Sequence, residues 1–170
     1  HDKIRGWGDY ADGKIYDEMP YFEECLRLYD LEEVSEGGVD RRQPHTKMEL
    51  IHDALVMGIR NYFGKLGFRR AILGLSGGLD SAVVAVLAAR ALGPEHVRCL
   101  LMPSQFSSDH SITDARQLAQ NLGVQYDIVP IESIYGGFEE ALRPHFWATE
   151  FDIAEENIQA RIRGTLLMAM

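Results

Sequence analysis

The fold of this chain is decided by the stretch Ala71-Ile72-Leu73-Gly74-Leu75-Ser76-Gly77-Gly78-Leu79-Asp80-Ser81. Its first five residues form a short apolar run, which predicts a strand that is buried on both faces. A loop rich in glycine and serine follows at once. The Ala-, Val- and Leu-rich segment 80–92 then predicts a helix that ends at Gly93-Pro94. The stretch therefore predicts a strand, a tight loop and a helix in direct succession.

The same alternation of strand and helix continues towards the C-terminus. Segments 97–102 and 124–129 are apolar runs that each end at a proline, as expected of buried strands, and segment 112–122 is an amphipathic helix that ends at Gly123. Strands that alternate with helices imply a parallel sheet with right-handed crossovers. We therefore expect an α/β fold with an open, doubly wound parallel sheet. In such sheets, ligands bind beyond the carboxyl ends of the strands.

The segments on the amino side predict a different organisation. Residues 46–49 have the capping-box pattern that begins a helix, and Asp12-Gly13 predicts the turn of a short β-hairpin. The polar, glycine-containing segment 32–44 closes at Pro44 and predicts a linker. We therefore expect three parts, at residues 1–31, 32–45 and 46–170.

Composition limits the classes of protein to be considered. The chain has 170 residues, of which 46% are hydrophobic and 25% charged, and its net charge is −9. This length suits one domain and is short for two, and the apolar content excludes a wholly disordered chain. No apolar run approaches the roughly 18 residues of a membrane span, so no membrane partner is expected. The acidic balance argues against a nucleic-acid partner, because neutralising phosphates needs a basic face.

Two cysteines, Cys25 and Cys99, cannot build a disulfide framework and lack metal-ligand spacing. Both have apolar neighbours, so we expect two buried thiols in a cytoplasmic protein. The chain starts at His1 rather than Met, and residues 166–170 continue an apolar helical pattern without a stop signal. We therefore expect a piece of a longer protein, truncated at its C-terminal end.

The loop over residues 76–81 has the chemistry of an anion-binding site. Gly77 and Gly78 expose backbone N–H groups, and the helix that follows directs its free N–H groups and dipole to the same place. Ser76 and Ser81 add two hydroxyl donors. Asp80 beside an anion suggests that Mg²⁺ bridges it to phosphate oxygens. A plain Gly-Gly turn with ordinary capping residues is the simpler alternative, but the order of the residues favours phosphate binding. The Walker A lysine and the GxGxxG pattern are both absent.

These residues carry a family resemblance. The sequence SGGLDS at 76–81 matches the SGGxDS loop of the ATP pyrophosphatases, which split ATP into AMP and pyrophosphate. The surrounding sequence resembles NAD synthetase from about Met48 to Met170, with the adenine nucleotide alpha-hydrolase-like fold that this implies. The segments that carry this narrower resemblance are LGLSGGLDSA at 73–82, ALGPE at 91–95, MPS at 102–104, Ser107-Ser108, Asp114-Ala115, Leu122-Gly123 and ENIQARIRG at 156–164.

A second resemblance lies near the N-terminus. The sequences ADGKI at 11–15 and MPYFEE at 19–24 resemble the last strands of the nitrilase-type glutaminase domain that is fused to glutamine-dependent NAD synthetases. Residues 1–31 would then be a short β remnant of that preceding domain, and an arbitrary hairpin is the alternative. The nucleophilic cysteine of the glutaminase would lie outside this chain, so neither Cys25 nor Cys99 is assigned that role.

The resemblance implies a ligase that amidates deamido-NAD to NAD. ATP would adenylate the substrate and release pyrophosphate, and ammonia, supplied by glutamine hydrolysis in the longer protein, would displace AMP. The partners implied are ATP, Mg²⁺, deamido-NAD, and ammonia or glutamine, in a homo-oligomer. The alternatives are another SGGxDS-loop adenylating ligase, GMP synthetase-like or tRNA-thiolating, and a non-catalytic ATP-binding module. Segment 157–164 argues against another adenylating ligase of this kind. The presence of Asp80 argues against a non-catalytic module.

The resemblance also assigns roles to individual residues. Asn157, Arg161 and Arg163 are expected to contact deamido-NAD. Asn157 and Arg161 share one helix face at i,i+4 spacing, while Arg163 points elsewhere; from spacing alone, all three would be an ordinary solvated face. Asp80 is expected to hold the metal, and the loop to stabilise the departing pyrophosphate. The residues expected to bind ATP are Gly74, Leu75, Ser76, Gly77, Gly78, Leu79, Asp80, Ser81 and Ser104.

Overall fold

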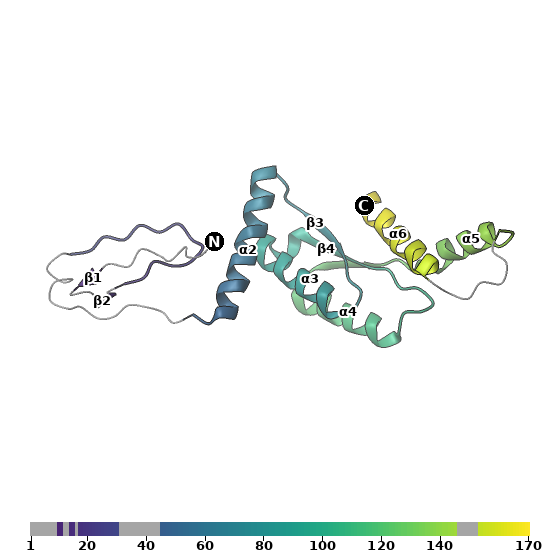
Figure 1. Cartoon of the computed structure of the whole chain (residues 1–170), viewed down its shortest axis with the longest axis horizontal. Helices are drawn as coiled ribbons and strands as arrows, with labels where there is room; N and C mark the ends of the chain where they lie inside the picture. The colour runs from purple at the N-terminus through teal and green to yellow at the C-terminus, as the bar shows by residue number, and fades with distance from the viewer. Residues whose placement is uncertain (1–9, 12–13, 16, 31–44, 146–152) are drawn as a thin grey trace. The chain divides into compact units, whose positions relative to one another are not determined.

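The computed structural model describes residues 10–11, 14–15, 17–30, 45–145 and 153–170. The chain divides into two compact units, His1–Gly58 and Ile59–Met170, and Figure 1 labels most of their elements. All but the last residue of the predicted linker lies outside the described residues. The division of the chain into three parts therefore stays a prediction.

The first unit contains a small hairpin. Strands β1 (Tyr10–Ala11) and β2 (Lys14–Ile15) pair antiparallel, which confirms the predicted hairpin, although its Asp12-Gly13 turn lies outside the described residues. The expectation of a buried thiol at Cys25 is wrong, because this cysteine is exposed. It lies in a segment, residues 24–30, that forms neither helix nor strand and whose side chains are mostly exposed.

The helix α2 (Lys47–Leu66) begins at the predicted capping box. The Thr46 N–H donates to Glu49 Oε2 at 2.7 Å, and the Glu49 N–H donates to Thr46 Oγ1 at 3.2 Å. The hydrogen bonds from Thr46 lower the pKa of the Glu49 carboxyl. The helix ends before Gly67, which adopts a φ of +72°. Both ends of α2 are therefore fixed by local sequence.

The second unit is built on a three-stranded parallel sheet. Its strands β3 (Ala71–Gly74), β4 (Val97–Leu101) and β5 (Gln125–Ile128) lie in the order β3-β4-β5. The α/β fold with a parallel sheet is thus confirmed. The expectation that segment 71–75 forms a strand buried on both faces is wrong for β3, which is half-buried because it pairs with β4 alone among the described strands. The central strand β4 is the buried one.

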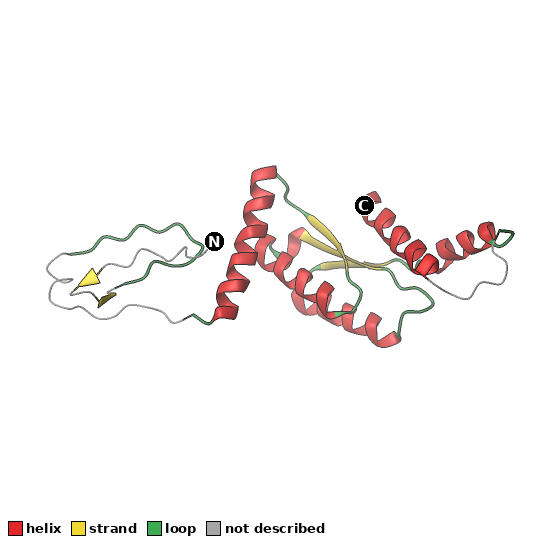
Figure 2. Ribbon diagram, in the orientation of Figure 1, coloured by secondary structure: helices red, strands yellow, loops and turns green. Residues whose placement is uncertain are grey.

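Four helices accompany the sheet (Figure 2), together with the short 3₁₀ turn η1 (Pro94–His96). The helices α3 (Leu79–Leu92) and α4 (Asp109–Leu122) cover one side, while α6 (Ile153–Ala169) lies on the other side with α5 (Glu132–Leu142). The sequence patterns do not predict α5, because Ile131 at its N-cap supplies no side-chain cap and Gly136-Gly137 interrupts it. No helix in the described part of the chain is long and apolar enough to cross a bilayer.

Alternate residues of β4 face two separate hydrophobic clusters. Val97, Cys99 and Leu101 pack with buried alanines of α3 and α4. Leu100, together with Met102 directly after the end of β4, packs with residues of α5 and α6, including Tyr135 and Ile162. Because each face of the sheet is covered by its own pair of helices, the predicted doubly wound arrangement is confirmed.

The buried thiol of Cys99 provides a test of this packing. Cys99 is fully buried in an apolar cluster, which raises the pKa of its thiol. A Cys99→Ser substitution places a hydroxyl group there and is expected to lower the free energy of unfolding by about 1–3 kcal/mol. Urea unfolding of the intact protein measures this loss. Cys25→Ser, at the exposed cysteine, is the control and is expected to leave stability unchanged. An equal effect at both positions would contradict the packing.

Candidate functional site

The serine- and glycine-rich loop leaves the carboxyl end of β3, as the sequence predicts. The Leu75 N–H donates to the Leu100 carbonyl oxygen at 3.0 Å, which extends the pairing of β3 with β4 by one residue. The loop therefore begins directly at the edge of the sheet and ends at Leu79, where α3 begins. This is the position at which open α/β sheets bind ligands.

Two serine hydroxyls hold this loop in shape. Ser81 Oγ accepts a hydrogen bond from the Ser76 N–H at 3.2 Å and donates one to the Gly78 carbonyl oxygen at 2.9 Å. Ser76 Oγ accepts from the Gly78 N–H at 3.2 Å and lies 3.0 Å from Ser81 Oγ. The loop is therefore bonded across its own width, which preorganises its backbone.

Gly77 is the tightest point of the loop. Its φ is +84°, and a Cβ atom at this position would lie 2.2 Å from the backbone carbonyl oxygen of Ser111 in α4. Gly78 has a φ of −84°, and a Cβ there would meet only Ser76 Oγ, at 3.4 Å. The first glycine therefore allows the close approach of the loop to α4, whereas the second is free of any such constraint.

The N-terminus of α3 has no side-chain cap. Its N-cap residue is Gly78, which is extended and has no side chain with which to accept a hydrogen bond. By contrast, Ser108 caps α4, and its Oγ accepts from the Ser111 N–H at 3.2 Å. The positive end of α3 therefore remains available to an anion, and the first turn of this helix carries the exposed residues Leu79 and Asp80.

A cavity of about 370 Å³ lies beside the loop, which is a suitable size for a small organic ligand. Its polar groups come from Ser76, Ser107, Ser111 and Arg163, and most of the remaining lining is apolar. Residues from the ends of β3 and β4, from the loop after β4, and from α4 and α6 contribute to it. The complete lining is Gly74, Leu75, Ser76, Leu100, Leu101, Met102, Pro103, Ser107, Ser111, Ile112, Ala115, Arg163 and Leu167.

The structure brings only part of the predicted ATP-binding set to this cavity. Gly74, Leu75 and Ser76 line it, but residues 77–81 and Ser104 do not. The Ser104 hydroxyl instead accepts a hydrogen bond from the Phe106 N–H at 3.3 Å, so it closes a turn. Sequence reasoning missed Ser107 and Ser111. The rule that the carboxyl ends of adjacent parallel strands share one site could have found them, because they follow β4.

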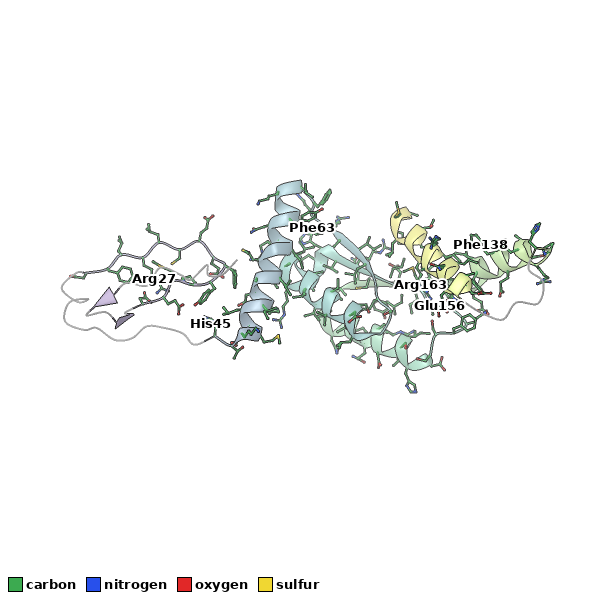
Figure 3. The ribbon with its side chains drawn as sticks, in the orientation of Figure 1. Arg27, His45, Phe63, Phe138, Glu156 and Arg163 are labelled. Carbon is green, nitrogen blue, oxygen red and sulfur yellow. The ribbon has the colours of Figure 1, made fainter. Side chains whose placement is uncertain are left out.

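The three predicted residues of α6 lie in two different environments. Arg161 and Asn157 are exposed, and Arg161 Nη1 donates to Asn157 Oδ1 at 3.2 Å. Arg163 instead faces the sheet (Figure 3), where its Nε donates to the Met102 carbonyl oxygen at 3.2 Å. Burial lowers the pKa of the Arg163 guanidinium below its usual value. The predicted separation of Arg163 from the other two residues is therefore confirmed.

A magnesium ion fits this site only in part. Among the residues that the structure describes, no three His, Cys, Asp or Glu side chains are grouped so that they could hold a metal. One carboxylate, Asp80, lies in the first turn of α3. This is compatible with Mg²⁺ because that ion commonly takes one or two carboxylates, substrate phosphates and water. Any magnesium bound here would therefore be shared with a phosphate ligand.

A model of the NAD synthase family matches residues 51–170. The chain belongs to the NAD synthase family. Two curated relatives are named glutamine-dependent NAD(+) synthetase. The one from Synechocystis is 47% identical, over 99% of this chain and 31% of its own length. The one from Rhodobacter capsulatus is 43% identical, over 94% of this chain and 30% of its own length. The chain thus spans less than a third of the length of these relatives.

Solved structures of two synthetases share the fold. A glutamine-dependent NAD+ synthetase from Acinetobacter baumannii, in complex with ADP, is 38% identical and superposes with a TM-score of 0.83, over 93% of this chain and 30% of that one. An NH3-dependent NAD synthetase from Campylobacter jejuni, in complex with a nitrate ion, is 34% identical with a TM-score of 0.64, over 74% of this chain and 52% of that one. Both comparisons agree with the family match.

The two glycines of the loop give a matched pair of variants. Gly77→Ala forces a β-carbon against the Ser111 backbone at a positive φ, so we expect a loss of about 1–3 kcal/mol in the free energy of unfolding, or more. Gly78→Ala has room and an ordinary φ, so its effect is expected to stay below about 1 kcal/mol. Chemical unfolding of the two variants measures the difference. Equal stability would show that the loop does not approach α4 as described.

Proposed function

We propose that the protein containing this chain is an ATP-dependent NAD synthetase that amidates deamido-NAD. The observation that carries this proposal is the uncapped N-terminus of α3, which follows a serine-braced loop at the carboxyl end of β3 and lies beside a cavity. This arrangement offers backbone donors and a helix dipole to a phosphate group. The family match favours this function over a GMP synthetase-like enzyme, a tRNA-thiolating enzyme or a non-catalytic ATP-binding module.

In this proposal, ATP binds at the cavity and the loop. The apolar walls of the cavity, which include Met102, Ile112 and Leu167, suit a purine base. The backbone of Gly74–Ser81 would bind the phosphates, and the ADP complex of the Acinetobacter baumannii relative supports a nucleotide in this fold. Ser104 would act indirectly, by holding the loop that follows β4.

The first chemical step needs no general base, because the nicotinate carboxylate of deamido-NAD is already a nucleophile. One of its oxygens attacks the α-phosphorus of ATP, the bond from that phosphorus to the bridging oxygen breaks, and pyrophosphate leaves with the electron pair. The amides of Gly77 and of residues 79–81 would stabilise the charge that develops on pyrophosphate, because those of Ser76 and Gly78 already donate to serine hydroxyls within the loop. Removal of one such donor typically raises the activation free energy by about 3 kcal/mol. Asp80 would hold the Mg²⁺, which adds further charge stabilisation when bound.

The second step forms the amide. Ammonia attacks the acyl carbon of the adenylate, the bond from that carbon to the phosphate oxygen breaks, and AMP leaves with the electron pair while the nitrogen loses one proton to solvent. We infer that glutamine supplies the ammonia through a glutaminase domain of which residues 1–31 are the tail. The match to the Synechocystis relative, which covers 99% of this chain, supports that inference. We also infer a cytoplasmic homo-oligomer, as the family resemblance implies.

The exposed pair Asn157 and Arg161 is the part of α6 that would contact deamido-NAD. Their mutual hydrogen bond of 3.2 Å fixes an amide and a guanidinium side by side on one helix face. Together they offer donors for the carboxylate or phosphates of the dinucleotide. This role rests on the resemblance of segment 156–164 to the family.

The function is tested by following pyrophosphate and NAD in the intact protein. With ATP, Mg²⁺ and deamido-NAD, we expect both products to form when ammonia or glutamine is present. Asp80→Asn should slow pyrophosphate release by about a hundredfold or more, because it removes the carboxylate expected on the metal. Glu140→Gln, an exposed carboxylate on α5, is the control. Absence of NAD with either nitrogen donor would exclude the function, and activity with ammonia alone would exclude the glutaminase inference.

A further inference from the structure

Arg163 is the only charged side chain among the residues that line the cavity in the described part of the chain. It comes from α6, whereas the loop comes from β3 and α3, so the two lie far apart in the sequence. Figure 3 labels Arg163 beside the sheet. Its location separates it from Asn157 and Arg161, which form their own exposed pair.

The Arg163 guanidinium is fixed at one end. Its Nε donates to the carbonyl oxygen of Met102, which follows directly after the last residue of β4. A guanidinium has five N–H donors in a planar fork, and this bond uses one of them. Because Nε is held, the plane of the fork is oriented while its Nη groups keep donors for another partner.

The charge of Arg163 also lacks a carboxylate partner within the described residues. The arginine ion pairs found there join Arg27 to Asp17 and Arg98 to Asp127, the other two involve histidines, and none involves Arg163. Arg163 is nevertheless half-buried, and burial lowers its pKa. A half-buried cation is costly unless an anion compensates it. A ligand anion in the cavity would supply that compensation.

We propose that Arg163 binds the α-phosphate of the nucleotide and is oriented for this by its bond to the Met102 carbonyl oxygen, rather than contacting deamido-NAD. This inference rests on the proposed function. The cavity that Arg163 lines is the space that would hold the nucleoside, and the α-phosphate is the phosphate attached to that nucleoside. The exposed end of α3, with Asp80, would take the phosphates that leave. Arg163 would therefore stay on the phosphate that remains in the acyl-adenylate and in AMP.

Dissociation constants for ATP, AMP and adenosine test this role in the intact protein, with adenosine measured by displacement of a fluorescent ATP analogue. Arg163→Gln is expected to weaken the binding of ATP and AMP roughly 10- to 100-fold, which corresponds to the loss of one charge-assisted hydrogen bond. The binding of adenosine should weaken by less than about threefold. Arg163→Lys keeps the charge but loses the fork, so it should weaken AMP by an intermediate factor. Arg90→Gln removes an exposed charge in the last turn of α3 and is the matched control, with no change expected.

Each other outcome overturns the proposal. Equal losses for AMP and adenosine would show that Arg163 only shapes the cavity, and a loss for ATP without a loss for AMP would place Arg163 on a different phosphate. The proposal would also be excluded if Arg163→Gln bound ATP and AMP as tightly as the wild type does. The same holds if Arg163→Lys bound AMP as tightly as the wild type does. If Arg163→Gln does not fold, the Lys variant decides alone. A wild-type protein that binds neither ATP nor adenosine would instead exclude the proposed function itself.

Discussion

The parallel pairing of β3 with β4 is the constraint on which the site depends. In this register Gly74 lies opposite Leu100, and the Leu75 N–H donates to the Leu100 carbonyl oxygen. The two strands therefore end together, and the loop over residues 76–81 lies next to the chain that leaves β4 at Met102. An antiparallel pairing would separate these two ends. The cavity exists because both strand ends, and the helices that follow them, meet at one edge of the sheet.

A second constraint is the shape of the loop itself. Its two serine hydroxyls bond to each other and to the loop backbone, while Gly77 passes close to the Ser111 carbonyl oxygen of α4. The next helix then begins at a glycine that cannot cap it. The chain thus forgoes the stabilisation of a side-chain cap at a helix end where an anion could take the place of the cap. Functional sites commonly give up local stability in this way.

Local sequence signals were sufficient to predict much of this arrangement. The capping box at Thr46, the glycine stop at Gly123 and the apolar run of β4 act over a few residues, and each is found where predicted. The burial of β3 and Cys25 was mispredicted because burial depends on which segments pack alongside, and a periodicity cannot show that. The helix α5 was missed because it is stabilised by the packing of Tyr135 rather than by its caps.

The candidate site shows the same division between local and long-range information. The residues of the SGGLDS loop are contiguous, so the sequence alone was enough to predict an anion-binding loop there. Ser107, Ser111 and the contact of Arg163 with Met102 arise from segments that meet only in the folded sheet. The spacing of residues along the helix indicated that Arg163 points away from Arg161. That spacing could not show that Arg163 lines a cavity.

A structure of the intact protein with a non-hydrolysable ATP analogue would show whether the loop after β3 binds phosphate. We expect the terminal phosphates to accept hydrogen bonds from backbone amides of the 76–81 loop and the first turn of α3, with the nucleoside in the cavity at the ends of β3 and β4. An analogue bound elsewhere, with its phosphates away from this loop, would contradict it.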